Sequence, residues 1–233
     1  MSTHKLDLRN IKLGELYIVA TPIGNWQDIT LRAIDVLKNA DAVICEDRKI
    51  GSTLAKNIGI EVKEWIEVSE HNETHAGDFI QERLLGGASL ALITDCGTPV
   101  FSDPGARIIE RALGLGARVI PIPGASSLMA ALSVLDVQLT RFYFAGFLPR
   151  QPDERRSMLE YLRKMHIPVI LMDTPYRMDT VLKDAIKAFG SGRKAVLACD
   201  LTLPGEIVHR GNLGEIYKHA SGKKSEFILI IMQ

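Results

Sequence analysis

One stretch of this sequence, from Thr94 to Gly105, combines residues that suit ligand binding better than an ordinary turn. Its twelve residues include two glycines and two prolines. Such a loop is stiff and lets a ligand approach the backbone closely, while the proline carbonyls can accept weak bonds from polarised C–H groups. We therefore expect a ligand with a positive centre, such as a sulfonium methyl. Asp95 could meet an amine or a ribose hydroxyl of that ligand, or could simply form the turn.

Two further loops carry small or rigid residues. Residues 121–127 (PIPGASS) place small side chains at the start of an expected helix, where N–H groups and hydroxyls could contact a ligand. Ser126 could equally be an ordinary helix cap. Residues 21–25 (TPIGN) lack both the glycine-rich dinucleotide fingerprint and the lysine of a phosphate-binding loop. Pro22 makes this turn rigid, so we do not expect it to bind pyrophosphate.

Glu46, Asp47 and His71 are the candidates for a general base. They follow expected strands, and neighbouring carboxylates can raise one another's pKa until one becomes a useful base. The structural alternative is that Glu46 and Asp47 cap the next helix and that His71 is a surface histidine. The residues alone slightly favour this alternative.

Short apolar runs that alternate with helical patterns must position these loops. The expected strands are residues 16–20, 41–45, 62–68, 90–94 and 118–122 in the first half, and 142–147, 168–172, 195–199 and 226–232 in the second. Expected helices follow Asp28 or Thr30 and lie near 50–58, 76–86, 105–115, 153–165, 178–189 and 213–220. This alternation predicts an α/β fold, in which ligands bind beyond the carboxyl ends of parallel strands.

Composition limits the class of protein. Hydrophobic residues make up 46% and charged residues 24%, which excludes extended disorder. No apolar run reaches the roughly 20 residues that cross a bilayer, and the first residues lack the apolar core of a signal peptide. The cysteines Cys45, Cys96 and Cys199 are too far apart for a zinc or disulfide framework, so we expect a cytoplasmic protein without metal.

Charge is balanced overall but uneven along the chain. The 28 basic and 28 acidic residues cancel, yet residues 1–140 carry a net charge of −5 and residues 141–233 carry +5. This asymmetry suggests a polyanionic partner for the second half, although scatter of surface charge would explain it equally well.

A series of motifs, taken in order, is typical of one enzyme family. These are residues 16–25 (LYIVATPIGN), 46–47 (ED), 71–73 (HNE), 95–105 (DCGTPVFSDPG), 121–124 (PIPG), 146–150 (GFLPR), 175–177 (PYR), 201–202 (LT) and 226–227 (EF). Over essentially its whole length the chain resembles the bacterial 16S rRNA ribose 2′-O-methyltransferases, which belong to the tetrapyrrole methylase superfamily of class III S-adenosylmethionine (SAM) methyltransferases. In this comparison it resembles a short, divergent member.

The resemblance implies a fold, a cofactor and a partner. It implies two α/β domains, which we place at residues 1–138 and 139–233, with a mostly parallel first sheet, a mixed second sheet and SAM in the cleft between them. A homodimer is usual. The positions that match cofactor contacts are Pro22, Gly97, Thr98, Pro99, Ser126, Ser127, Met172 and Leu201. The implied substrate is 16S rRNA or the small ribosomal subunit, and the expected RNA contacts are Arg150 and Arg177.

Departures from the family pattern keep other functions open. Residues 174–177 read TPYR where the family commonly has Ser-Pro-His-Arg. Residues 199–203 (CDLTL) lack the two basic residues of the family's Arg-Glu-Leu-Thr-Lys stretch. We also do not expect the small C-terminal extension that longer members carry. One alternative is SAM-dependent C-methylation of a tetrapyrrole precursor or another small molecule, for which a neutral, apolar cleft is expected. Another is a non-catalytic module that binds RNA or SAM. If RNA is bound, replacing Arg150 or Arg177 with Ala should flatten the salt dependence of binding.

Overall fold

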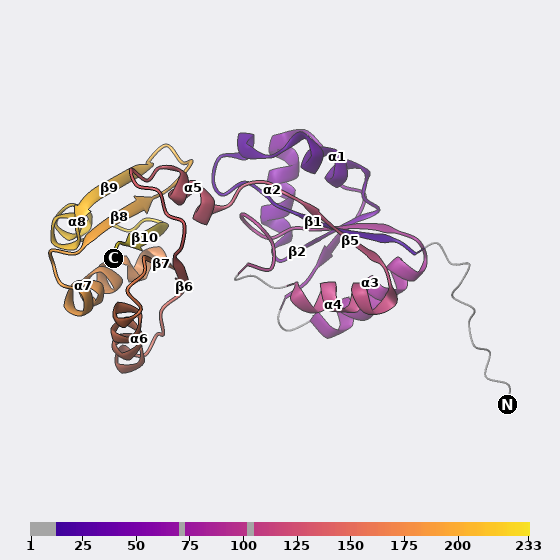
Figure 1. The fold of residues 1–233 in the computed structure, drawn as a ribbon. Coiled ribbons are helices and arrows are strands. Elements are labelled where there is room, and N and C mark those ends of the chain that lie inside the picture. Colours follow the sequence, from indigo (N-terminus) through magenta and orange to yellow (C-terminus); the bar gives the residue numbers. More distant parts are fainter. Residues whose placement is uncertain (1–12, 70–72, 102–104) are drawn as a thin grey trace, which may run out of the picture. The chain divides into compact units, whose positions relative to one another are not determined.

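The chain consists of two compact units, residues Met1–Ser126 and Ser127–Gln233. The computed structural model describes residues 13–69, 73–101 and 105–233, and each unit has one five-stranded sheet with helices packed on it (Figure 1). The predicted residue His71 and part of the Thr94–Gly105 loop lie outside the described residues.

All strand pairings in the first unit are parallel, as the alternation of apolar runs predicts. The sheet order is β3-β2-β4-β1-β5. Its strands are β1 (Glu15–Val19), β2 (Ala42–Cys45), β3 (Trp65–Glu67), β4 (Ser89–Leu92) and β5 (Arg118–Ile122). β3 is shorter than the expected strand over residues 62–68, and Val62, which precedes it, packs against the core.

Helices cover both faces of this sheet. They are α1 (Leu31–Asn39), α2 (Arg48–Ile58), α3 (Glu73–Leu85) and α4 (Ala106–Leu115), and a short 3₁₀ turn, η2 (Trp26–Asp28), precedes α1. Thr30 caps α1, since its hydroxyl accepts the N–H of Ala33 at 3.1 Å. Asp28, the other cap candidate, lies in η2.

The connections after β1 and β4 lead to opposite faces. The helix after β1, α1, packs with Val19 and Val43 on one face, whereas α4, which follows β4, packs with Leu16 on the other (Figure 1). Because β1 and β4 are neighbours, their carboxyl ends form the topological switch point at which open α/β sheets bind ligands.

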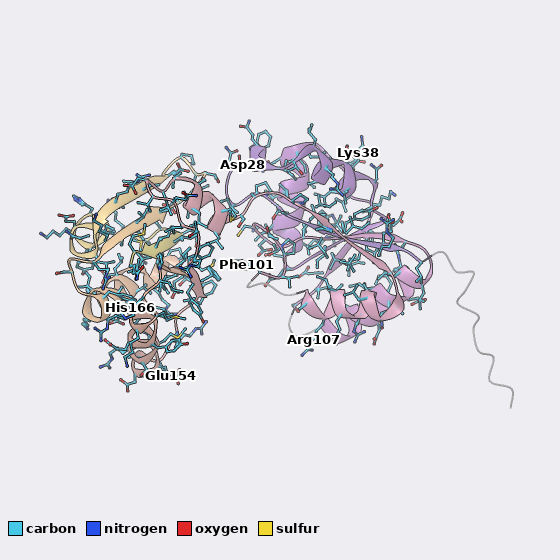
Figure 2. All side chains as sticks on the ribbon, viewed as in Figure 1. Asp28, Lys38, Phe101, Arg107, Glu154 and His166 are labelled. Atoms are coloured by element: carbon cyan, nitrogen blue, oxygen red, sulfur yellow. The ribbon has the colours of Figure 1, made fainter. Side chains whose placement is uncertain are left out.

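The second unit contains a mixed sheet with the order β6-β7-β10-β8-β9. β6 and β7 are parallel, and β10 is antiparallel to both β7 and β8. The elements are α5 (Ser127–Ser133), β6 (Tyr143–Gly146), α6 (Pro152–Lys164), β7 (Val169–Asp173), η3 (Pro175–Arg177), α7 (Met178–Phe189), β8 (Lys194–Cys199), β9 (Ile207–Asn212), α8 (Leu213–Ala220) and β10 (Phe227–Ile231). Glu154 and His166, labelled in Figure 2, mark the start and the end of the α6 region.

The two faces of the second sheet are covered differently. Side chains of α6, α7 and α8 form the core on one face, whereas α5 packs on the other through Ala131. The division of the chain therefore falls before α5, while the predicted boundary near residue 138 lies beyond it. β9 was not expected from the sequence, because this exposed strand contains His209, Arg210 and Gly211 in place of an apolar run.

Within the part of the chain that the structure describes, no helix is both long and apolar enough to cross a membrane. The same residues hold no group of three or more potential metal ligands. Cys45 and Cys199 are buried, and burial raises the pKa of their thiols to about 12 and about 11. Cys96 is exposed in the loop after β4.

Candidate cofactor and substrate site

Hydrogen bonds join the three predicted loops of the first unit. The N–H of Thr21 donates to the carbonyl of Gly97 at 2.8 Å, and the N–H of Gly97 donates back to Thr21 at 3.1 Å. The hydroxyl of Thr98 donates to the carbonyl of Ala125 at 3.3 Å. These bonds connect the loops after β1, β4 and β5, which are neighbouring strands. The structure thus brings the predicted loops together at the carboxyl edge of the sheet.

Thr21 is the residue that fixes this arrangement. It is only 1% exposed, and its hydroxyl lies 3.2 Å from the carbonyl oxygen of Thr94, to which it donates. A buried hydroxyl with a backbone partner holds the ends of β1 and β4 in register. Thr21 is not among the residues predicted to contact the cofactor, although its position directly after an apolar strand is a signal that the sequence offers.

The loop after β4 has an unusual backbone. Gly97 has φ of +81° and Gly105 has φ of +123°, in the region that favours glycine. Val100 has φ of +72°, which is strained for a β-branched residue. Strain of this kind costs about 1–3 kcal/mol and clusters at functional sites. Phe101, labelled in Figure 2, is exposed beside it.

The predicted cofactor residues of the first unit lie along one edge at different depths. Pro22, Gly97 and Pro99 are buried, Asp95 and Ser126 are partly buried, and Thr98 is exposed. The third loop approaches β1 closely, because a Cβ on Gly124 would lie only 3.1 Å from the Cβ of Ala20.

Of the two carboxylates after β2, Asp47 has a structural role. Asp47 caps α2, since one carboxylate oxygen accepts the N–H of Lys49 at 2.7 Å and the N–H of Ile50 at 3.4 Å. Glu46 is exposed. The pKa of Asp95, in the loop after β4, is raised by burial and by the nearby charge of Asp47, although the backbone N–H of Asp47 opposes the shift. Asp47 therefore acts as a helix cap, as the structural alternative to a general base expects.

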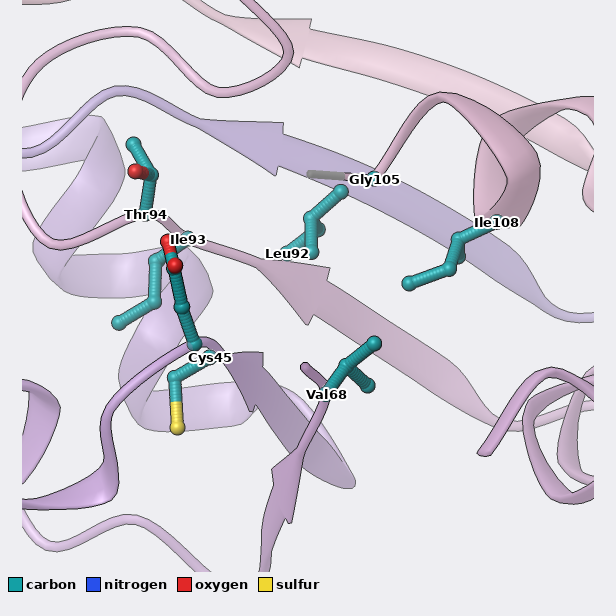
Figure 3. A pocket seen from close by; sticks show the side chains of 8 residues that line it. Cys45, Val68, Leu92, Ile93, Thr94, Gly105 and Ile108 are labelled. Atoms are coloured by element: carbon teal, nitrogen blue, oxygen red, sulfur yellow. The ribbon is translucent and has the colours of Figure 1, made fainter. Parts of the chain in front are cut away.

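A small cavity of about 10 Å³ lies between the ends of β2 and β4 (Figure 3). Cys45 and Thr94 line its polar end, and Ile108 of α4 closes the other. This volume holds one water at most. A larger hollow of about 250 Å³ lies beside α1, lined by Tyr17, Arg32 and Ser89 among others. Because Ser89 begins β4, that hollow is away from the predicted loops.

The predicted cofactor residues of the second unit share one face of its sheet. Met172 of β7 and Leu201, which follows β8, pack against the cluster that contains Ala131 of α5. Ser127 is the first residue of α5. Leu201 lies between two strained residues, Asp200 and Thr202, whose φ values are +50° and +67°.

The side chain of Arg177 is occupied within its own unit. Nη2 donates to the carbonyls of Leu148 and Pro149, both at 2.9 Å, and Nη1 lies 3.3 Å from Oδ2 of Asp173. Oδ2 makes no hydrogen bond of good geometry, so we treat this contact as an ion pair only. Burial raises the pKa of Asp173 despite the neighbouring arginine. Arg177 therefore positions the loop after β6.

A second arginine holds the same loop. Nε of Arg155 donates to Asp184 at 2.7 Å in a buried ion pair, and Nη1 donates to the carbonyls of Pro149 and Arg150 at 3.2 and 2.8 Å. The side chain of Arg150 itself is exposed. Of the two predicted RNA contacts, Arg150 can meet a partner directly, whereas Arg177 is committed to the loop.

Comparisons with solved structures concern the fold. The fold matches that of a uroporphyrin-III C-methyltransferase from Thermus thermophilus complexed with S-adenosylhomocysteine, with a TM-score of 0.66 and 17% identity over 94% of this chain and 98% of that one. A diphthine synthase matches with a TM-score of 0.72 and 18% identity over 94% and 90% of the two chains. This chain thus shares its fold with both proteins.

The chain belongs to the tetrapyrrole (corrin/porphyrin) methylase family, whose sequence profile matches residues 15–217. A relative from Neisseria meningitidis serogroup A, named ribosomal RNA small subunit methyltransferase I, is 40% identical over 222 residues, covering 94% of this chain and 76% of the relative. Relatives of the same name from Bacillus subtilis and Escherichia coli O157:H7 are 36% and 33% identical, covering 94% of this chain and 75% and 77% of the relatives. The resemblance inferred from the motifs is confirmed.

Proposed function

We propose that this chain methylates small-subunit ribosomal RNA, using SAM to modify a ribose 2′-hydroxyl. The observation that carries the proposal is the identity of 33–40% to relatives named for that substrate, over nearly the whole chain. Such a substrate would place the activity in the cytoplasm. The homodimer that the resemblance implies belongs to the same proposal, and sedimentation of the purified protein tests it.

The loops at the carboxyl edge of the first sheet fit a sulfonium ligand. Pro22 and Pro99 contribute no N–H donors, and Gly97 presents backbone without a side chain. Carbonyl-rich loops of this kind suit a positive centre with polarised C–H groups better than they suit a phosphate. Asp95 stands at the end of β4 with a carboxylate that could accept from an amine or a ribose hydroxyl.

Positioning is the main contribution that these residues can make. When bound, SAM supplies an activated methyl group, so that transfer to the ribose oxygen forms one C–O bond, breaks one S–C bond and releases the hydroxyl proton. The bonds among Thr21, Gly97, Thr98 and Ala125 keep the loops in one arrangement before any ligand arrives, which raises the effective concentration of the reactants. Asp47 is committed as the cap of α2, so its carboxylate is poorly placed to accept the hydroxyl proton.

Transfer of a labelled methyl group tests the proposal. Purified protein and radiolabelled SAM are incubated with 30S subunits or with naked 16S rRNA, and nucleoside mass spectrometry identifies any 2′-O-methyl product. We expect one labelled ribose. If rRNA stays unlabelled while uroporphyrinogen III becomes methylated, the chain is a tetrapyrrole methyltransferase, as its structural neighbours of 17–20% identity include. If neither is methylated but SAM or RNA binds, it is a non-catalytic module.

A further inference from the structure

Tyr176 is unusually exposed for a large aromatic residue. It lies in η3, directly after β7, and is 79% exposed. The ammonium of Lys224 lies 5.0 Å from the centre of its ring, a cation–π distance that orients the side chain. A ring held in solvent in this way is a surface on which another flat group could stack.

A second exposed aromatic residue follows the neighbouring strand. Phe147 comes directly after β6 and is 47% exposed. Because β6 and β7 are parallel neighbours, both aromatics follow carboxyl ends at the same edge of the sheet. Arg177, next to Tyr176, donates to the carbonyl of Leu148, next to Phe147, at 2.9 Å. The two loops are thus fastened to each other.

Positive charge accompanies the two aromatic residues. The exposed Arg150 lies at the end of the loop that begins with Phe147, and Lys224 stands on the ring of Tyr176. Two acidic residues, Asp200 and Glu226, also lie at this edge. The carboxylate of Asp200 accepts the backbone N–H of Glu226 at 3.0 Å. Burial raises the pKa of Glu226. Charge alone therefore does not define the surface, and its distinctive feature is aromatic rings beside cations.

We propose that Tyr176 and Phe147 stack on unpaired bases of the RNA substrate while Arg150 and Lys224 contact its phosphates. Proteins recognise RNA mostly in single-stranded segments, where bases can turn out and stack on aromatic side chains. Such stacking tolerates any base sequence and combines with nearby cations. The ion pair of Arg177 and the bonds of Arg155 hold the loop after β6 in place, so little order has to be gained on binding. This inference rests on the proposed function and names its recognition surface.

Substitution of Tyr176 tests the inference. Affinity for a fluorescent, unstructured uridine 20-mer and KM for 16S rRNA are compared among the wild type, Tyr176→Ala, Tyr176→Phe and Tyr161→Ala. Tyr161 lies on α6, is 56% exposed and serves as the matched control. We expect Tyr176→Ala to weaken binding about tenfold, as the loss of one stacked base does, and the other two variants to stay within about twofold of the wild type.

The salt dependence separates stacking from charge. Tyr176→Ala should leave the slope of log affinity against log salt unchanged, whereas Arg150→Ala should reduce it by about one. If the wild type methylates 16S rRNA but Tyr176→Ala and Tyr161→Ala bind the uridine 20-mer equally well, the stacking surface is refuted and the proposed function stays intact. A wild type that methylates no rRNA refutes the function itself. If Tyr176→Ala unfolds, Phe147→Ala decides by the same criteria.

Discussion

Replacing Gly97 with alanine tests where the ligand binds, and Gly59 provides a matched control. Both residues have positive φ, +81° at Gly97 and +72° at Gly59, which ends α2. An alanine in this conformation costs about 1–2 kcal/mol at either site. The surroundings differ, because a Cβ at Gly59 meets nothing within 4 Å, whereas at Gly97 it lies 3.4 Å from Ile23. A separation of 3.4 Å is ordinary van der Waals contact and adds little strain. The free energy of unfolding in urea should therefore fall by a similar amount in both variants.

SAM affinity should separate the two variants. The new methyl group at position 97 projects between the first and third loops, within 4.0 Å of the carbonyl of Ala125. Excess volume in a packed site costs about 1–3 kcal/mol, or roughly 5- to 150-fold in affinity. Calorimetry with SAM and S-adenosylhomocysteine should show this loss for Gly97→Ala, total loss for Gly97→Val, and unchanged affinity for Gly59→Ala. Unchanged affinity for Gly97→Ala, in a variant that shows the stability loss, would mean that the ligand binds elsewhere.

Three further expectations concern stability. Asp47→Ala should lower the free energy of unfolding by about 1 kcal/mol, because a helix cap is lost, and should keep methyl transfer if the base lies elsewhere. Asp184→Ala leaves Arg155 buried without its carboxylate partner and should lower the free energy of unfolding by about 3–5 kcal/mol. Asp153→Ala, which removes an exposed ion pair, should lower it by less than about 1 kcal/mol, and equal losses in the two variants would contradict this expectation. Burial lowers the pKa of His209, so the folded state binds its proton less tightly than the unfolded state. Stability should fall as pH drops below about 6.5, and His209→Gln should reduce that fall.

The sequence predicts the architecture of the first unit well because a parallel sheet is buried on both faces. Its strands therefore appear as continuous apolar runs, and the loops after them share one edge. The contacts between the loops that begin near Thr21, Thr94 and Pro121 follow from this geometry. The apolar runs do not reveal the order of the strands, so the sequence could not show that Thr21 and Gly97 follow neighbouring strands.

The second unit is less predictable where exposure removes the pattern. β9 is an edge strand whose residues are partly or fully exposed, so no apolar run identifies it. α5 follows the third loop directly, and nothing in its sequence shows that Ala131 packs with the second sheet. Local sequence likewise cannot reveal a role that depends on a partner far along the chain, such as the buried ion pair of Asp184 with Arg155.

Charge counted along a sequence overstates the charge that a polyanion can meet. From the sequence alone, replacing either Arg150 or Arg177 is expected to flatten the salt dependence of RNA binding. In the structure Arg177 lies against Asp173 and donates to two carbonyls, so its charge is compensated before RNA arrives. We now expect Arg177→Ala to weaken RNA binding by loosening the loop after β6, with no change in the salt slope, whereas Arg150→Ala reduces the slope by about one. RNA titrations of the wild type and both variants at several salt concentrations measure these slopes. A reduced slope for Arg177→Ala would show that, in the wild type, the Arg177 guanidinium leaves Asp173 to contact a phosphate.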